Sequence, residues 1–277
     1  MAVTPGVLTV EEVSPGRWSV PHPDKDPEGR DIVFSGQILG QMIMASSAAA
    51  KGEKEVKSVH AVFARAGRYS AGPLELHLEE MHAGRAWASH TVTAVQGDRL
   101  LARGLVLLNT VEPDLMRHSP TMPDVPAPEQ CSPLETGVVF PDSEVRVVEG
   151  VAGAPSMSVW VRSGTSSDSV AASQAIVAWC EPGLLIGAAI RPHRDTVDAS
   201  QAHRTISTGV ISHTAHFHEH GDPSDWLLYV HDATYAGHGR IFGQGSVFTR
   251  EGTLVSTFGQ DSMARVVEGD LDFKTGM

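Results

Sequence analysis

Three histidines in the last third of the chain have a spacing that could bind a metal ion. His216, His218 and His220 alternate in ISHTAHFHEH and would project from the same face of a β-strand. Three imidazoles on one face can hold zinc and leave a position open for the water of a hydrolytic reaction. Because no carboxylate or fourth ligand completes the set, solvent-facing or hydrogen-bonded histidines are the preferred interpretation, and we predict no metal site.

Other short catalytic motifs are missing from the sequence. No G-x-S-x-G occurs, and GRYSAG has the wrong spacing for a nucleophile elbow. The nucleotide-binding patterns G-x-x-x-x-G-K-[ST] and G-x-G-x-x-G do not occur either. The two cysteines, Cys131 and Cys180, are too few for a disulfide framework and lack metal-ligand spacing. These observations argue against a serine hydrolase of this type, a nucleotide hydrolase and a dinucleotide-dependent enzyme.

The composition is typical of a soluble globular protein. Of the 277 residues, 41% are hydrophobic and 19% are charged, so the chain can bury a substantial core in one large or two ordinary domains. The formal net charge of −12 argues against a general nucleic-acid binder and against adsorption to anionic membranes. No apolar run approaches the length of a membrane span, so we expect no span and a cytoplasmic location.

A proline-rich stretch divides the chain into two halves. The segment EPDLMRHSPTMPDVPAPEQCSPLETGVVFP begins at Glu112, and its prolines block helix interiors and central strands. We therefore predict an N-terminal domain over residues 1–111, a linker over 112–142 and a C-terminal domain over 143–277.

Each half contains a helix pattern followed by strand patterns. Ser35–Lys51 has the apolar spacing of a helix with one buried stripe. Ser167–Cys180 is a second predicted helix, with Ser167 or Asp168 as its N-cap. Runs of β-favouring residues separated by glycine-containing turns follow each helix and predict antiparallel meanders. The predicted class is therefore α+β, with a helix lying across a curved sheet in each half.

The two meanders also resemble each other in sequence. Gly239–Gln260 aligns without a gap over Gly84–Leu105, at a constant offset of 155 (240 − 85), and five residues agree, including the turn glycines. We interpret this as a duplication. At that offset Thr234 corresponds to Glu79 and Gln260 to Leu105, so we expect the first half to lack this polar pair.

Four segments together resemble a known family. They are FSGQILGQ in the first helix, SVHAVFARAG in the next strand, MPDVPAP in the linker and DWLLYVHDATYAGHGRIFGQGSVFTREGTLVSTFGQDSMAR near the C-terminus. From about Arg30 to Arg265 the chain resembles the acyl-CoA thioesterase II family, whose members carry two fused hot dog domains. The resemblance implies a central helix wrapped by a curved antiparallel sheet in each half, an acyl-CoA substrate, and hydrolysis to a free acid and coenzyme A without a cofactor.

The same resemblance implies a set of site residues. The family uses an Asp, a Thr or Ser, and a Gln of the second hot dog domain to activate water. The Thr falls on Thr234 and the Gln on Gln260, whereas the Asp position, before His213, holds Ser212. Hydrolysis also needs donors for the developing oxyanion, and backbone N–H groups at the start of the helix containing Gly36 and Gln37 could supply them.

The missing aspartate leaves alternatives open. Ser212 could hold the water without accepting its proton, or the chain could be an acyl-CoA binding or sensing protein with impaired hydrolysis. Glu181, just after the second predicted helix, and Glu219 could replace the carboxylate, although an exposed position is expected for each. Fusion satisfies the pairing that single hot dog domains need, yet exposed sheet edges leave a homo-oligomer possible.

Overall fold

The protein is a single continuous sheet folded around two helices. The computed structural model describes residues 6–20, 31–51, 54–136, 139–150, 154–167, 169–193, 197 and 206–266. The helices are α1 (Ser35–Ala49) and α2 (Val170–Ile190). The strands are β1 (Glu11–Ser14), β2 (Arg17–Ser19), β3 (Glu55–Phe63), β4 (Glu75–Ala83), β5 (Trp87–Gln96), β6 (Arg99–Asn109), β7 (Ser132–Pro133), β8 (Glu144–Val148), β9 (Ser156–Arg162), β10 (Ile206–Phe217), β11 (Leu227–Gly237), β12 (Arg240–Thr249) and β13 (Leu254–Val266).

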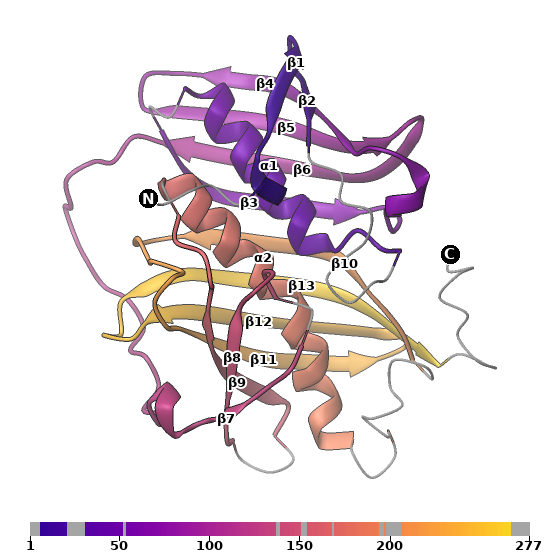
Figure 1. Ribbon diagram of the computed structural model, residues 1–277. Coiled ribbons are helices and arrows are strands. Elements are labelled where there is room, and N and C mark those ends of the chain that lie inside the picture. Colours follow the sequence, from indigo (N-terminus) through magenta and orange to yellow (C-terminus); the bar gives the residue numbers. More distant parts are fainter. Residues whose placement is uncertain are drawn as a thin grey trace.

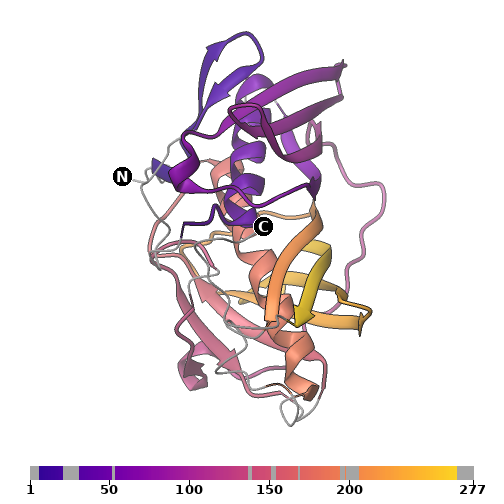
Figure 2. The same ribbon diagram turned by 90° about the vertical axis from the view of Figure 1, so that its right-hand side faces the viewer.

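The order of the strands confirms the predicted duplication. The 13 strands are ordered β1-β2-β4-β5-β6-β3-β10-β13-β12-β11-β9-β8-β7, so β4-β5-β6-β3 in one half corresponds to β11-β12-β13-β10 in the other. All pairs are antiparallel, and the halves meet where β3 pairs with β10. The predicted meanders are wrong at the first strand of each half, because β3 and β10 pair with the last strand of their half, β6 and β13, and not with the next one. Each half of the sheet curves around its own helix (Figures 1 and 2). The predicted α+β class, with a central helix wrapped by a curved antiparallel sheet in each half, is confirmed.

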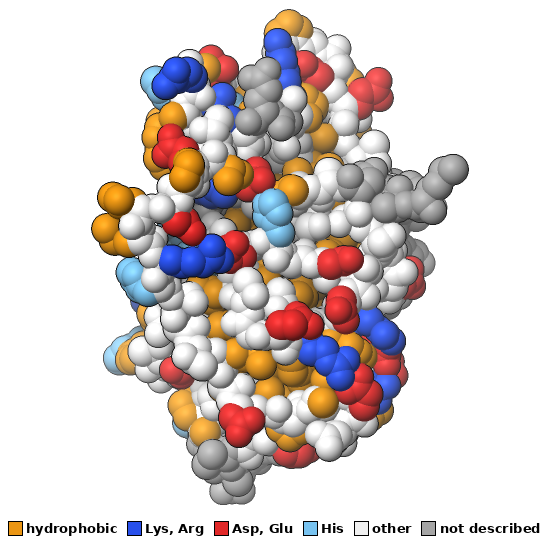
Figure 3. Space-filling view, turned by 90° about the vertical axis from the view of Figure 1, so that its left-hand side faces the viewer, with side chains coloured by type: hydrophobic (Ala, Val, Ile, Leu, Met, Phe, Trp, Pro, Cys, Tyr) orange, Lys and Arg blue, Asp and Glu red, His pale blue; other side chains and the backbone are white. Residues whose placement is uncertain are grey.

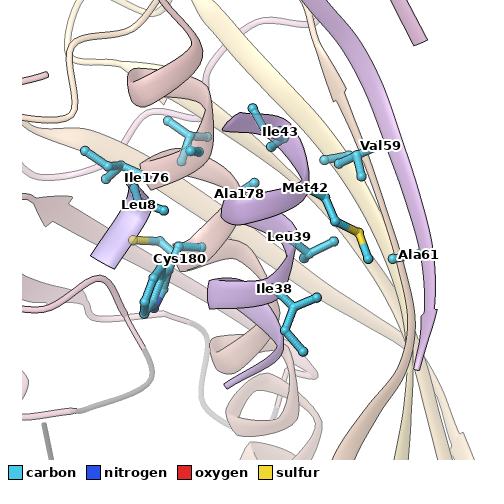
Figure 4. Close-up of a cluster of buried hydrophobic side chains, with 14 of the residues drawn as sticks. Leu8, Ile38, Leu39, Met42, Ile43, Val59, Ala61, Ile176, Ala178 and Cys180 are labelled. Atoms are coloured by element: carbon cyan, nitrogen blue, oxygen red, sulfur yellow. The ribbon is translucent and has the colours of Figure 1, made fainter. Parts of the chain in front are cut away.

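The two helices share one core at the junction of the halves. Figure 4 shows Met42 of α1 directed at Ala61 of β3, and Cys180 of α2 on the opposite side of α1 in this view. These side chains belong to a single cluster of buried residues that extends over both helices and both halves of the sheet. Glycine permits the close approach, because a Cβ on Gly36 would lie 2.3 Å from the carbonyl oxygen of Trp179 on α2. The start of α1 is therefore held directly against the middle of α2.

The second helix differs from its prediction at both ends. It begins after Ser169, whose Oγ accepts a hydrogen bond from the backbone N–H of Ala172 at 3.2 Å, so the predicted N-cap at Ser167 or Asp168 is wrong. It also continues through Pro182 to Ile190 instead of ending at Cys180.

The length of α2 also corrects the expectation about apolar runs. Val170–His193 is a helical segment of 24 residues whose mean hydropathy reaches 1.3, which is long and apolar enough to cross a membrane. However, 72% of that apolar window is buried inside the protein. It is the core helix of the second half, and so gives no clear sign of a membrane span.

The gapless alignment of the two meanders is wrong in one strand. Val92 of β5 pairs with Gly104, 12 residues farther along the chain (104 − 92), whereas its counterpart Val247 pairs with Ser256, only 9 residues farther along (256 − 247). The β12–β13 hairpin is therefore three residues shorter than the β5–β6 hairpin. With β5 and β12 kept at the offset of 155, Gln260 corresponds to Leu108 rather than to Leu105. The two residues lie on equivalent faces of the sheet, since Leu108 and Gln260 are both buried against a helix.

The same register also corrects the second proposed pair and adds a new one. The correspondence of Thr234 with Glu79 fails, because Leu78 of β4 pairs with Val92 while Tyr229 of β11 pairs with Val247. His213 pairs with Gln260, and Val56 pairs with Leu108, so His213 corresponds to Val56.

The predicted linker lies against the outer face of the second half. It passes along one side of the molecule (Figure 1), where Met122 and Val125 pack on a small apolar cluster that includes Trp160 and Trp226. The indole N–H of Trp160 donates to the carbonyl oxygen of Pro126 at 2.9 Å. Within the same stretch, β7 adds to the edge of the sheet beside β8. The domain limits at residues 111 and 143 stay predictions.

Candidate functional site

Gln260 lies at the centre of a buried polar network in the second half. It is 1% exposed and faces α2 from the middle of β13. Its amide Nε2 donates to the carbonyl oxygen of Pro182 at 2.9 Å and to Ser262 Oγ at 2.7 Å. Its Oε1 lies 3.1 Å from Nδ1 of His213 on the neighbouring strand β10. The predicted site residue is therefore held by partners from three elements.

Glu181 provides the carboxylate of this network. It is fully buried on α2, with Oε2 at 2.8 Å from His213 Nε2 and Oε1 accepting a hydrogen bond from Ser256 Oγ at 2.6 Å. The expectation that Glu181 is an exposed residue after the helix was wrong, because the helix continues through Pro182 and points this side chain at the sheet. Glu219, by contrast, is exposed as expected and pairs with Arg117.

Side chains from the sheet also bind the helix backbone at Pro182. His231 of β11 donates from Nε2 to the carbonyl oxygen of Glu181 at 3.3 Å, next to the Pro182 carbonyl that Gln260 binds. Burial lowers the pKa of His231 to about 4, so its imidazole is neutral at pH 7. Burial likewise raises the pKa of the Cys180 thiol to about 12, which makes it a poor nucleophile.

Ser212 and Thr234 lie outside this network. Ser212 is partly buried and its Oγ donates to Asp261 Oδ2 at 3.5 Å, on the face of β10 opposite to His213. Thr234 is exposed, where the pairing of β11 with β12 shifts register. Among the described residues, no hydrogen bond joins either side chain to Gln260. Their catalytic roles stay predictions.

The start of α1 approaches the network from the first half. Gly36 lies against the carbonyl of Trp179, two residues before Glu181 on α2. Gln37 is 2% exposed, and its Oε1 accepts a hydrogen bond from the hydroxyl of Tyr69 at 2.7 Å. The first turn of α1, proposed as the source of oxyanion donors, thus packs beside the turn of α2 that carries the carboxylate.

The three alternating histidines have separate environments. His218 Nε2 lies 2.9 Å from Thr257 Oγ1 and His220 Nε2 lies 3.0 Å from Glu55 Oε1, while His216 is exposed. In the part of the chain that the structure describes, no group of three or more His, Cys, Asp or Glu side chains is placed to hold a metal ion. On the face shown in Figure 3, acidic side chains lie between the basic ones, so no extended basic area is seen there.

Comparison with known proteins assigns the fold and the family. Residues 22–109 match the family model described as the N-terminal domain of acyl-CoA thioesterase, and residues 139–267 match the model described as acyl-CoA thioesterase. The chain belongs to the acyl-CoA thioesterase family. The matched ranges lie on either side of the proline-rich stretch, one in each half.

Individual members of this family resemble the chain over most of its length. It is 23% identical to acyl-coenzyme A thioesterase 8 of Mus musculus, covering 84% of this chain and 80% of the relative. It is 24% identical to acyl-CoA thioesterase 2 of Haemophilus influenzae, covering 85% and 88%.

Solved structures confirm the two fused hot dog domains. A tesB protein of Mycobacterium avium subs paratuberculosis superimposes with a TM-score of 0.79 at 24% identity, covering 94% of this chain and 97% of that one. Acyl-CoA thioesterase II TesB2 of Mycobacterium marinum gives a TM-score of 0.80 at 22% identity, covering 95% and 97%.

Several residues of the network were not predicted from the sequence. His213 served only to mark the position after the missing aspartate, and Ser256 and Ser262 were not considered. A signal was present, because Ser256, Gln260 and Ser262 alternate along β13 and share its buried face with Phe258. Polar residues at even spacing in an otherwise apolar strand indicate a buried polar cluster.

Proposed function

We propose that this protein hydrolyses acyl-CoA thioesters. Water adds to the thioester carbonyl carbon, the carbon–sulfur bond breaks, and the products are a carboxylate, coenzyme A and one proton. The match of both halves to acyl-CoA thioesterase families carries this proposal. No cofactor is required for this chemistry, and a fatty acyl chain is the substrate class that we propose.

In the proposed mechanism Gln260 orients the attacking water and the first turn of α1 stabilises the oxyanion. Backbone N–H groups at Gly36 and Gln37 are proposed for the second task because the start of a helix carries the positive end of the helix dipole and its first amides have few intrahelical acceptors. The Gln37 N–H already donates to the carbonyl oxygen of Phe34 at 3.1 Å, so Gly36 is the better suited of the two. Support comes from the packing of this turn beside Trp179, close to the Glu181 turn. Thr234 and Ser212 are proposed to contribute hydroxyl groups at the edge of the site.

The alternative, an acyl-CoA binding or sensing protein, is not favoured. The relatives that match over more than four fifths of this chain are named thioesterases. The loss of the aspartate at Ser212 motivated that alternative, yet a different carboxylate, that of Glu181, is bonded to the residue next to Ser212.

The proposal is tested by release of coenzyme A thiol from short, medium and long acyl-CoAs. Gln260→Ala is expected to abolish release. Gln244→Ala is the matched control, because Gln244 is exposed on the outer face of the neighbouring strand β12. No release by the unaltered protein from any chain length would support the binding alternative, and equal release by the Gln260 variant would exclude Gln260 from catalysis.

Two further proposals accompany the activity. A cytoplasmic location is proposed and can be checked by cell fractionation with an antibody to the protein. A homo-oligomer is also possible, and light scattering of the purified protein measures its mass against the 29.5 kDa of one chain.

A further inference from the structure

The buried carboxylate of Glu181 and the imidazole of His213 form a pair with no water contact. Both side chains are 0% exposed, and 2.8 Å separates Glu181 Oε2 from His213 Nε2. The other carboxylate oxygen, Oε1, accepts the Ser256 hydroxyl. Every polar atom of these two side chains therefore has a partner, as a buried ionisable group requires.

The orientation of the Gln260 amide is fixed by its partners. The Pro182 carbonyl can only accept a hydrogen bond, so the amide nitrogen, and not the oxygen, must face it. The second amide hydrogen is directed at Ser262 Oγ. With both N–H groups used, the Gln260 side chain has only its oxygen left for any further contact.

The donor and acceptor roles of its partners also fix the protons on His213. Because Gln260 Oε1 can only accept, His213 Nδ1 must carry a hydrogen and donate it. One more proton then lies between His213 Nε2 and Glu181 Oε2, on either atom. An amide oxygen has two lone pairs, and His213 occupies one. Among the residues that the structure describes, no second donor reaches this oxygen, so a single acceptor position on Gln260 is left free.

The first half shows that this polar set is not needed to fill the core. The positions that correspond to His213 and Gln260 hold Val56 and Leu108, which are both fully buried in the same location between helix and sheet. A hydrogen-bonded chain from α2 through His213 to Gln260 therefore distinguishes the half that is proposed to carry the reaction.

We propose that Glu181 and His213 are positioning residues that hold the Gln260 amide oxygen as a one-site acceptor for an O–H of the attacking water. This inference rests on the proposed function. It assigns the Glu181 carboxylate, which acts on Gln260 through His213, as the carboxylate present in place of the missing aspartate. Accepting an O–H of the water leaves a lone pair of its oxygen free to attack the thioester carbon. The pair acts on orientation, so its loss lowers kcat and leaves KM little changed.

Kinetics of two variants test this role. The double variant Glu181→Leu with His213→Phe removes the pair without leaving a lone buried charge, and we expect kcat to fall by about 10- to 100-fold at similar KM. Glu181→Gln retains an acceptor for Ser256 and a donor to His213 Nε2, so kcat is expected to stay within about threefold of the unaltered value. His90→Phe is the control, because His90 is also buried but lies on β5 in the first half.

A result independent of activity comes from nitrogen NMR of histidine-labelled protein. A signal assigned by its loss in His213→Phe should show Nδ1 protonated between pH 6 and 8, and Glu181→Gln should retain that hydrogen. A bare Nδ1, or full kcat in the double variant, would overturn the positioning role. If the unaltered protein releases no thiol at all, the proposed function fails, whereas a bare Nδ1 in an active enzyme overturns only this inference.

Discussion

Corresponding positions in the two halves hold opposite kinds of side chain between helix and sheet. Val56 and Leu108 fill this space in the first half, and His213 and Gln260 fill it in the second. Both halves nevertheless form the same strand order around a central helix. Apolar filling is thus sufficient for the fold, and the polar set costs free energy unless each group is paired. The difference supports the proposal that the second half carries the reaction, whereas the first core is filled by apolar packing alone.

The largest expected effect comes from breaking the polar core at one residue. His213→Val leaves the Glu181 carboxylate without its histidine partner, and removing one member of a buried charged pair costs about 3–5 kcal/mol. Urea unfolding measures this loss.

Replacing all three polar residues by apolar ones, as in the first half, should restore the stability lost in the single variant. The triple variant Glu181→Leu, His213→Val, Gln260→Leu is expected to be as stable as the unaltered protein or more so, because apolar replacement of a buried pair is commonly neutral or stabilising. A single variant with an unchanged unfolding midpoint, or a triple variant as unstable as the single one, would break the comparison.

The second effect is a pH dependence of the free energy of unfolding that arises from His231 in the second half. The pKa of His231 is lowered to about 4 by burial, from about 6.5 in an unfolded chain. The unfolded state therefore binds more protons between these values, and stability falls as pH decreases from about 6.5 to 4, by up to about 3 kcal/mol. Urea unfolding at pH 7 and pH 4.5 should show a smaller difference for His231→Phe. An identical difference in both proteins would contradict the assignment.

A third, smaller effect concerns the contact between the helices. Gly36→Ala places a Cβ 2.3 Å from the Trp179 carbonyl oxygen, so the helices must separate. Overpacking of this kind costs about 1–3 kcal/mol, and thermal unfolding measures it. An unchanged melting temperature would mean that α1 and α2 can separate without cost.

The smallest effect is a gain in stability from a substitution in α2. A Cβ on Gly187 of α2 would meet only Met157 Sδ at 3.5 Å, an ordinary contact. Gly187→Ala is therefore expected to stabilise the protein by about 0.5–1 kcal/mol, since alanine loses less backbone entropy in a helix. Thermal unfolding of Gly187→Ala and Gly36→Ala should show melting temperatures that shift in opposite directions. A lower melting temperature in both variants would show that α2 does not tolerate a side chain at position 187.

The sequence predicted the helices and strands of the fold better than the order and register of the strands. Helix periodicity and alternating strands are local signals, so both helices and the strands that follow them could be recognised. The pairing of β3 with β6 and of β10 with β13 joins the ends of each half, which no local signal reveals. The register of β13 depends on a β12–β13 hairpin that is three residues shorter than the β5–β6 hairpin, and such a difference is invisible in an alignment made without gaps. For that reason Gln260 was assigned to Leu105 instead of Leu108.

Of the buried polar network, the sequence pointed to Gln260 alone, and the catalytic role of that residue stays a prediction. Gln260 was singled out, but Glu181 was assigned to the surface because the predicted helix ended at Cys180 and carboxylates are mostly exposed. In the folded chain, His231 and Gln260 donate to the carbonyls of Glu181 and Pro182 from positions 50 and 78 residues farther along the chain. Such long-range partners cannot be read from local pattern.

The pairing of β3 with β10 has a consequence for how the protein behaves on dilution. Two separate hot dog chains would dissociate at low concentration, whereas these halves are joined by one chain and meet at an effective concentration on the order of millimolar. The junction that brings α1 beside the Glu181 turn therefore re-forms at a rate independent of how much protein is present. A cell with few copies of this protein would still contain every copy assembled.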